Sequence, residues 1–182
     1  MQIADYIQIG ILIVLLLTVM VIIWQSFITQ KQLKLTQKQL DYTFEWQRRK
    51  TSLDFSHFTN ETIINNIMLL NKVFPNYYLS NETIPKEKIS KEIKNNPNVE
   101  TSLRTLMAHW ENLALALHSN LADEVLVYEM VAGTLVNYVK VFSSFIEMRK
   151  EQNIRSYSYL LELSEKWEKK LEGNKPERFS FE

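Results

Sequence analysis

The sequence of 182 residues contains no cysteine, only three glycines and four prolines, and no surplus of charge of either sign. The absence of cysteine excludes disulfide scaffolds, thiolate zinc sites, iron–sulfur clusters and cysteine nucleophiles. Three scattered glycines cannot build a phosphate-cradling loop, and the scarcity of turn residues disfavours many β-rich architectures. Lys and Arg together number 21, as do Asp and Glu, so the chain lacks the basic surplus of a general nucleic-acid binder. We therefore predict an all-α chain with no cofactor and no metal site, and we do not expect it to bind nucleic acid.

One hydrophobic run dominates the N-terminal part of the chain. Residues 9–24, IGILIVLLLTVMVIIW, carry no charge. As a helix, the segment from Tyr6 to Trp24 would rise roughly 28 Å, close to the thickness of about 30 Å of a hydrocarbon core. Asp5 before the run and WQSFITQKQ after it lack the features of a cleaved signal peptide, and a core helix is rarely apolar all round for this length. We predict a retained transmembrane helix within residues 1–25.

The charges that flank the run predict its orientation. No Lys or Arg precedes it, whereas Lys31, Lys34, Lys38 and the basic residues 48–50 follow it. The positive-inside rule therefore predicts a single-pass protein with its short N-terminus outside and its C-terminal bulk in the cytoplasm, so that the lipid membrane is a direct partner.

A long stretch without glycine or proline follows the run. It contains a seven-residue echo, TQKQLKL followed directly by TQKQLDY (residues 29–42), which places Leu33, Leu40 and Phe44 on one side of a helix. A period of seven favours helix-on-helix packing between subunits. We predict a stalk helix over residues 26–58 in which these three side chains contact other copies of the chain, and a straight solvated stalk is the alternative.

The remaining residues, 59–182, show apolar side chains at helical spacing, and we predict a cytoplasmic helical bundle. We expect helices over residues 63–74, 99–117, 127–149 and 157–171, and a loop over 75–98 that carries at most one short helix, near Lys86–Lys94. Asn98 is the expected N-cap of the second of these helices, and Asn120 with Asp123 resembles a capping pair that opens the third. Gly173 and Pro176 are expected to end the last helix.

Arg104 and His109 form an Arg-x4-His pair on the expected helix 99–117. The pair resembles the signature of the HEPN superfamily, helical domains that often act as metal-independent ribonucleases and in which two such motifs usually meet across a dimer interface. The resemblance implies that Arg104 would hold a scissile phosphate and that His109 would transfer a proton. On an ideal helix, residues five apart lie about 140° apart and share no face. Thr105 departs from the Asn, Asp or His more often found there in active members, and a structural role or a subunit contact is the alternative.

The single N-terminal span, the helical domain and the lone pair of Arg104 and His109 together resemble the small accessory membrane proteins of type VI-B CRISPR loci. This resemblance implies antiphage defence at the bacterial inner membrane, where a homo-oligomer would permeabilise the membrane in concert with an RNA-guided, RNA-cleaving effector. More diffusely, the chain resembles small bacterial one-span proteins of unassigned function with a helical core that carries Trp110-Glu111-Asn112, Asp123-Glu124, Arg149 and Trp167.

A pore built from one helix per subunit requires many copies. Helices packed about 9–10 Å apart leave an open lumen only when about six or more stand in a ring. The candidate lining residues fall within an arc of about 100° on the span. They are Gln8, Ile11, Leu15, Thr18, Ile22 and Gln25. The alternative is that Gln8 and Gln25 reach the two interfaces and that Thr18 bonds its own backbone. Lys31, Lys34 and Lys38 would form a positive vestibule in such a ring or contact anionic lipid.

The sequence supports three hypotheses from different classes. The first, which we favour, is a CRISPR-associated, non-enzymatic pore of about six or more identical subunits that permeabilises or depolarises the inner membrane. The second is a membrane-tethered HEPN-type ribonuclease that uses Arg104 and His109. The third is a membrane scaffold or receptor in which the span only localises a binding bundle.

Overall fold

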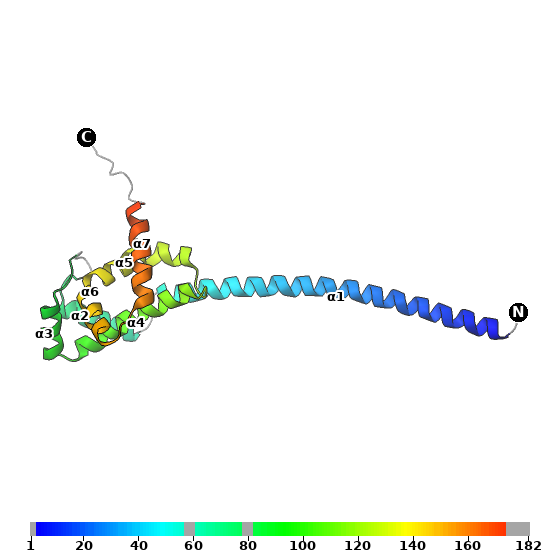
Figure 1. The fold of residues 1–182 in the computed structure, drawn as a ribbon, viewed down its shortest axis with the longest axis horizontal. Coiled ribbons are helices and arrows are strands. Elements are labelled where there is room, and N and C mark those ends of the chain that lie inside the picture. The colour runs from blue at the N-terminus through cyan, green and yellow to red at the C-terminus, as the bar shows by residue number, and fades with distance from the viewer. Residues whose placement is uncertain (1–2, 57–60, 78–81, 174–182) are drawn as a thin grey trace, which may run out of the picture. The chain divides into compact units, whose positions relative to one another are not determined.

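The computed structural model describes residues 3–56, 61–77 and 82–173, with side chains from Gln8 onward. Within these ranges the chain is all-helical, with seven helices and no strand (Figure 1). The helices are α1 (Ile3–Ser56), α2 (Glu61–Val73), α3 (Lys86–Asn95), α4 (Asn98–His118), α5 (Glu124–Val141), α6 (Ser143–Gln152) and α7 (Ser158–Gly173). The predicted fold class is confirmed, as is the short helix near Lys86–Lys94.

The chain divides into two compact units, Met1–Trp46 and Gln47–Glu182. The bundle was predicted to start at residue 59, whereas the second unit begins at Gln47. The reason is that the last turns of α1 contribute packed side chains: Ser52 and Ser56 are buried, and Phe55 packs against the hydrophobic core.

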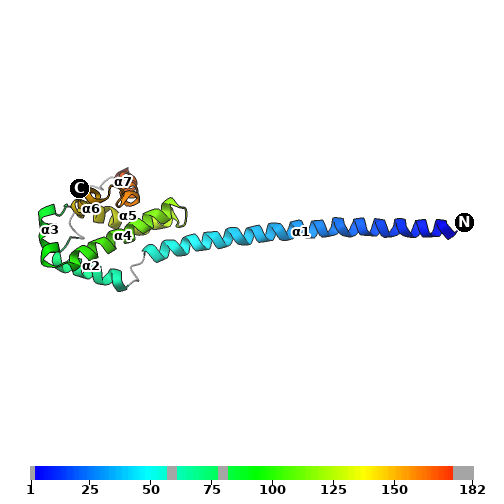
Figure 2. The ribbon, with the colours of Figure 1, turned by 60° about the horizontal axis from the view of Figure 1, so that its bottom comes forward.

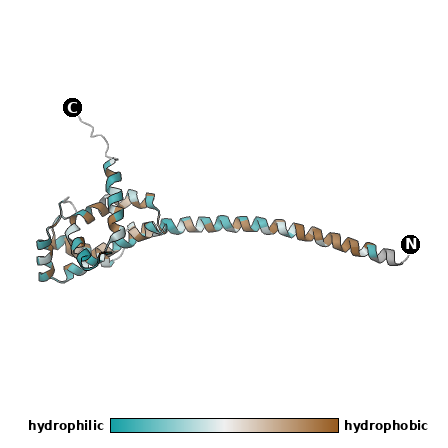
Figure 3. Cartoon of the chain, in the orientation of Figure 1, coloured by the Kyte–Doolittle hydropathy of each residue, from teal (hydrophilic) through white to brown (hydrophobic). Residues whose placement is uncertain are grey.

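Helix α1 continues from the apolar run into the stalk without a break. Figure 3 shows the change along it, from apolar residues near the N-terminus to mostly hydrophilic residues further on. No proline or further glycine interrupts the helix after Gly10, and its many Leu, Gln and Lys residues are good helix formers. The predicted transmembrane and stalk segments are therefore two parts of one helix.

The second unit is built around α4, which contacts α2, α3 and α7, while α5 packs against α6 and α7 (Figure 2). Two tryptophans, Trp110 of α4 and Trp167 of α7, are completely buried in the core. They lie among apolar side chains that the sequence places at helical spacing on every one of these helices, so burial of one face per helix accounts for the bundle.

The single helix predicted over residues 127–149 is wrong. Two helices, α5 and α6, replace it, and they meet at Phe142 with a bend of 65°. No glycine or proline marks the bend. Its cause lies in the tertiary structure, because the fully buried ring of Phe142 contacts the rings of Phe74 and Tyr77 at centroid distances of 6.1 and 5.0 Å.

The backbone groups at the end of α5 are satisfied by the segment before α3. The amide of Ile84 donates to the carbonyl of Val141 at 2.9 Å. The hydroxyl of Thr83 donates to the carbonyl of Lys140 at 3.0 Å. These bonds replace the intrahelical partners that a continuous helix would supply, so ending α5 costs little.

The capping residues differ partly from the prediction. Asn98 is the first residue of α4 rather than its N-cap, and its amide bonds the side chain of Asn96 at 3.1 Å. Asp123 is confirmed as the N-cap of α5, since its carboxylate accepts from the amides of Val125 and Leu126. Asn120 does not open this helix.

Asn120 instead ends α4. It has a left-handed backbone with φ of 59°. Its amide donates to the carbonyl of Leu117 at 3.1 Å, and the amide of Leu121 donates to the carbonyl of Ala116 at 2.8 Å. This pair of bonds is a Schellman motif with asparagine at the position that glycine usually takes.

Glu111 of α4 caps a different helix. Its carboxylate accepts from the amides of Leu160 at 2.7 Å and Tyr159 at 3.4 Å, in the first turn of α7. A negative charge at a helix N-terminus also interacts favourably with the helix dipole. The contact fastens α7 to α4 through a residue distant in sequence.

We predict that Glu111→Ala lowers the free energy of unfolding of the bundle by about 1–2 kcal/mol, because the first turn of α7 loses its acceptors. Glu111→Gln should lose less, because an amide oxygen still accepts. Urea titration of the full chain in detergent, followed by tryptophan fluorescence, measures the change. Glu129→Ala on the exposed surface of α5 is the control, and an equal loss in both alanine variants would contradict the capping role.

Candidate functional site

The apolar part of α1 has no protein cover. An 18-residue window of α1 has a mean hydropathy of 2.7, and none of its residues is buried. Such an exposed apolar surface suits hydrocarbon rather than water, so α1 is a candidate membrane-spanning helix by length and composition. The bent pair of α5 and α6 passes the same test as a broken span, but many of its apolar side chains lie in the core.

The predicted lining residues are all exposed on the span. They are Gln8, Ile11, Leu15, Thr18, Ile22 and Gln25. The hydroxyl of Thr18 donates to the carbonyl of Val14 at 2.7 Å, which is the backbone bond that the alternative interpretation expects. Its oxygen keeps the capacity to accept a further hydrogen bond, so this backbone bond is compatible with a position facing water.

The predicted stalk contacts are equally uncovered in the single chain. Leu33, Leu40 and Phe44 are 68%, 52% and 61% exposed. At about 100° per residue, they point within about 20° of one direction along α1. The lining residues of the span point to the same side, within about 80° of that direction. One continuous helix thus brings the two predicted sets into a common orientation.

The lysines of the stalk point elsewhere. Lys31, Lys34 and Lys38 lie about 100–160° from the direction of Leu33, which is roughly opposite to the lining residues. In a ring of straight helices, the lining residues and these lysines therefore cannot both face the lumen. With the lining set inside, the lysines face outward, where water and anionic headgroups solvate them.

In the second unit, His109 is held against the end of α1. Its Nε2 lies 3.1 Å from the carbonyl oxygen of Phe55. A carbonyl only accepts, so Nε2 carries the proton and donates it. The imidazole also contacts the rings of Phe55 and Trp110, at centroid distances of 5.8 and 5.3 Å. Burial lowers the pKa of His109, and the bond to Phe55 offsets part of this effect.

Arg104 lies on another face of α4. Its side chain is exposed and lines an open depression of about 400 Å³ together with residues of the α4, α6 and α7 regions. The lining residues are Arg104, Thr105, Ala108, Glu111, Asn112, Arg149, Ser156 and Tyr157. Arg149 is engaged there, with Gln152 at 2.6 Å and Glu100 at 3.6 Å. His109 does not line this depression, so the fold does not bring the two members of the pair together in one site.

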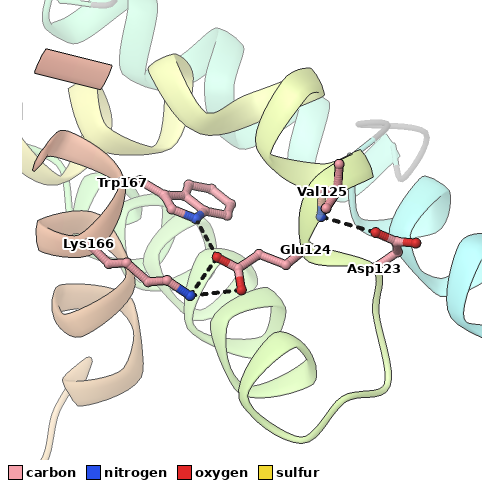
Figure 4. Close-up of polar contacts among 5 residues, drawn as sticks. All are labelled: Asp123, Glu124, Val125, Lys166 and Trp167. Carbon is pink, nitrogen blue, oxygen red and sulfur yellow. Dashed lines mark hydrogen bonds and ion pairs between the residues drawn. The ribbon is translucent and has the colours of Figure 1, made fainter. Parts of the chain in front are cut away.

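A second acidic residue, Glu124, joins α5 to α7 (Figure 4). Its carboxylate accepts from the indole Nε1 of Trp167 at 3.3 Å and from Lys166 at 2.8 Å. Burial would raise the pKa of Glu124, but the bonds from Lys166 and Trp167 and the nearby lysine charges lower it overall. In the sequence, Glu124 was noted only as part of the Asp123-Glu124 pair, and no contact was predicted for it.

The acidic residues Glu111, Asp123 and Glu124 thus have structural roles, of which only the capping role of Asp123 was predicted. Glu111 caps α7, Asp123 caps α5 and Glu124 binds Trp167. Ser52 near the end of α1 accepts from the amide of Asp123 at 2.6 Å. Within the described parts of the chain, no cluster of three His, Asp or Glu side chains has the arrangement of a metal site.

Comparison with known proteins gives one family match that covers most of the chain. A family model described as a domain of unknown function (DUF4760) matches residues 9–167, from the apolar part of α1 to α7. No curated protein and no solved structure matches the chain.

We predict that His109 makes the bundle sensitive to acid. Its pKa in the fold lies below the ordinary value of 6.5, so the unfolded chain takes up the proton more readily. The stability that depends on neutral His109 is fully present above about pH 6.5 and is lost as the pH falls below it. The free energy of unfolding of His109→Gln should therefore fall less between about pH 7.5 and 5.5 than that of the wild type.

Urea titrations of the full chain at a series of pH values measure this slope. His118→Gln is the matched control, because it removes an exposed imidazole from the same helix and leaves the buried imidazole of His109 in place. An unchanged slope in His109→Gln would show that burial of this imidazole does not govern the acid response.

Proposed function

The chain belongs to the DUF4760 family, and we propose that it is a membrane-anchored protein whose copies assemble into a pore of about six or more subunits. The observation that carries this proposal is the unbroken course of α1 from an uncovered apolar segment into a stalk with uncovered apolar side chains. The uncovered apolar segment can be buried in lipid, and the uncovered apolar side chains of the stalk can be buried against further protein. A self-associating membrane protein satisfies both.

The apolar segment is proposed to cross the bacterial inner membrane once. Its length matches the hydrocarbon core, and Trp24 with the following basic residues suits the interface at its C-terminal end. The absence of Lys and Arg before the segment supports an outer N-terminus and a cytoplasmic bundle.

The stalk is proposed to supply the energy of association. Apolar helices gain little from one another in lipid, so contacts outside the membrane have to hold the copies together. Burying one leucine or phenylalanine side chain contributes about 1.5–3 kcal/mol, and Leu33, Leu40 and Phe44 are all available in each copy.

The biological setting is proposed from the resemblance to the accessory membrane proteins of type VI-B CRISPR loci. In this setting the RNA-guided, RNA-cleaving effector is the functional partner, and recognition of foreign RNA leads to permeabilisation of the membrane. The HEPN-like character of the bundle rests on the same resemblance and on Arg104 and His109. It stays a prediction.

We propose that these two residues do not form a nuclease site within one chain, because His109 is bonded to Phe55 while Arg104 lines a separate depression. Ribonuclease activity would need groups from a second copy. Incubation of the full chain with RNA in the presence of a chelator tests this point. RNA cleavage that is lost in Arg104→Ala, while the bundle stays folded, would contradict the pore and support the ribonuclease.

We predict that the purified full chain releases a small dye from vesicles made of bacterial inner-membrane lipids. Leu40→Asp should reduce release at least about tenfold, because a carboxylate at the contact face opposes association at a cost above about 1.4 kcal/mol. Leu115→Asp on the exposed face of α4 is the control for loss of an exposed leucine and should retain release.

The activating partner is part of this test. Vesicles that stay tight with the full chain, even when the RNA-guided effector with guide and target RNA is present, would contradict the pore. If the antiphage function survives replacement of the span by an unrelated single-pass anchor, the result would favour the hypothesis of a membrane scaffold.

A further inference from the structure

The stalk of α1 carries a second set of exposed apolar side chains. Leu35, Tyr42 and Trp46 are 55%, 78% and 69% exposed. At about 100° per residue, they point about 160° away from Leu33, Leu40 and Phe44. We refer to Leu33, Leu40 and Phe44 as the first stripe and to Leu35, Tyr42 and Trp46 as the second stripe. Both stripes recur with the seven-residue echo, because Leu33 with Leu40 and Leu35 with Tyr42 occupy equivalent places in its two copies.

The two sides of α1 that lie between these stripes differ in chemistry. One side carries hydroxyl and amide groups and no charge from residue 29 to residue 46; it comprises Thr29, Gln32, Thr36, Gln39 and Thr43. The other side holds every charged residue of the same stretch, namely Lys31, Lys34, Lys38, Asp41 and Glu45. We refer to them as the Thr/Gln side and the charged side.

Two stripes on nearly opposite faces give each helix two neighbours. A symmetric dimer through the first stripe would leave the second stripe exposed to water. A symmetric dimer through the second stripe would leave the first stripe exposed. Contact of the first stripe of one copy with the second stripe of the next buries both. Leu40 and Tyr42 are two residues apart, about 3 Å along the axis, so such neighbours stand at nearly the same height and the contact closes into a ring.

Resting on the pore function proposed above, we infer that copies of α1 stand side by side in a ring in which first and second stripes alternate and the Thr/Gln side faces the lumen. In any ring, the lumen lies on the side where the two contact directions subtend less than 180°. On α1 this is the Thr/Gln side, with about 160° between the stripes. An angle of about 160° closes a ring of about 18 copies, and an angle smaller by the scatter of about 20° in helix packing closes a ring of about nine.

The surroundings of both sides fit this arrangement. Thr18 and Gln25 of the span point within about 20° of the Thr/Gln side, so the lumen lining continues into the membrane. Gln8, Leu15 and Ile22 of the predicted lining set point within about 20° of the first stripe instead, so in this ring they lie in the contact between copies. The charged side faces outward, where Lys31 and Lys34 lie near anionic headgroups. Asp41 and Lys38 are three residues apart, about 4.5 Å along the helix axis. At the outer edge of each contact, Asp41 of one copy therefore lies near Lys38 of the next, with charges of opposite sign.

The cysteine-free chain permits a direct test by cross-linking. The double variant Leu40→Cys with Tyr42→Cys, treated in isolated membranes with a short bifunctional maleimide, should give a ladder of products beyond the dimer. The two cysteines lie on opposite faces of one helix, so the reagent cannot join them within a chain. Each single variant should give little product. A dimer formed efficiently by Leu40→Cys alone, or no product from a double variant that labels fully with a small maleimide, would overturn the ring.

Accessibility gives a second test at polar positions, where substitution leaves the apolar contacts intact. In the assembled protein, Thr36→Cys should react with a polymer-linked maleimide wider than the lumen at least about tenfold more slowly than Lys38→Cys. A small maleimide should label both at similar rates. Equal rates with the polymer reagent would overturn the placement of the Thr/Gln side in the lumen.

These results are separable from those on the pore. A cross-linked ladder with vesicles that stay tight supports the ring and contradicts permeabilisation. Dye release together with efficient dimers of Leu40→Cys supports a pore and contradicts this arrangement of its helices.

Discussion

The unbroken backbone of α1 is the constraint on which the apolar span and the stalk both depend. A helix fixes the direction of every side chain relative to the others at about 100° per residue, so the span and the stalk cannot orient independently. Inside a bilayer the same continuity keeps all peptide groups bonded without help from other segments. The apolar span, the two stripes and the segregation of charge are therefore properties of one rigid element, and each limits what the others can contact.

The bundle depends on a different device, in which acidic and hydroxyl side chains of one helix satisfy the backbone or indole groups of another. Glu111 joins α4 to α7, Glu124 joins α5 to α7, and Ser52 joins α1 to the start of α5. The apolar faces of the helices supply most of the burial, but they tolerate sliding and rotation. Directional bonds to particular amides restrict these motions and specify which helix ends meet.

Much of this architecture was readable from the sequence, and the exceptions have definable causes. The helices α2, α3, α4 and α7 follow from apolar spacing and punctuation by Pro75 and Gly173. The bend at Phe142 was missed because its causes, the ring contacts and the bonds from Thr83 and Ile84, come from residues far away in the chain. The end of α4 was predicted to within one residue. The role of Asn120 was missed, because asparagine takes the place in its Schellman motif that glycine usually occupies.

In the candidate sites, too, some features could be predicted from local sequence and others depend on residues far away in the chain. The exposed faces of α1 follow from periodicity, because nothing in the single chain covers them. The separation of His109 from the depression around Arg104 also agrees with helical geometry. The carboxylate roles were not predictable, since Glu111 and Glu124 look like ordinary surface residues until their partners on α7 are in place. The quoted sequence patterns Trp-Glu-Asn and Asp-Glu were the available signal.

The continuity of α1 also limits how the length of its stalk can change. One residue inserted between Gln25 and Thr29 would turn everything after it by about 100°, out of phase with the span, and would move charged groups toward the side proposed to face the lumen. An insertion of seven residues turns it by only about 20° and keeps the phase. Members of this family with longer or shorter stalks are therefore expected to differ by numbers of residues that keep this phase, such as about seven or about eleven, so that length varies in steps while the two parts of α1 keep their relative orientation.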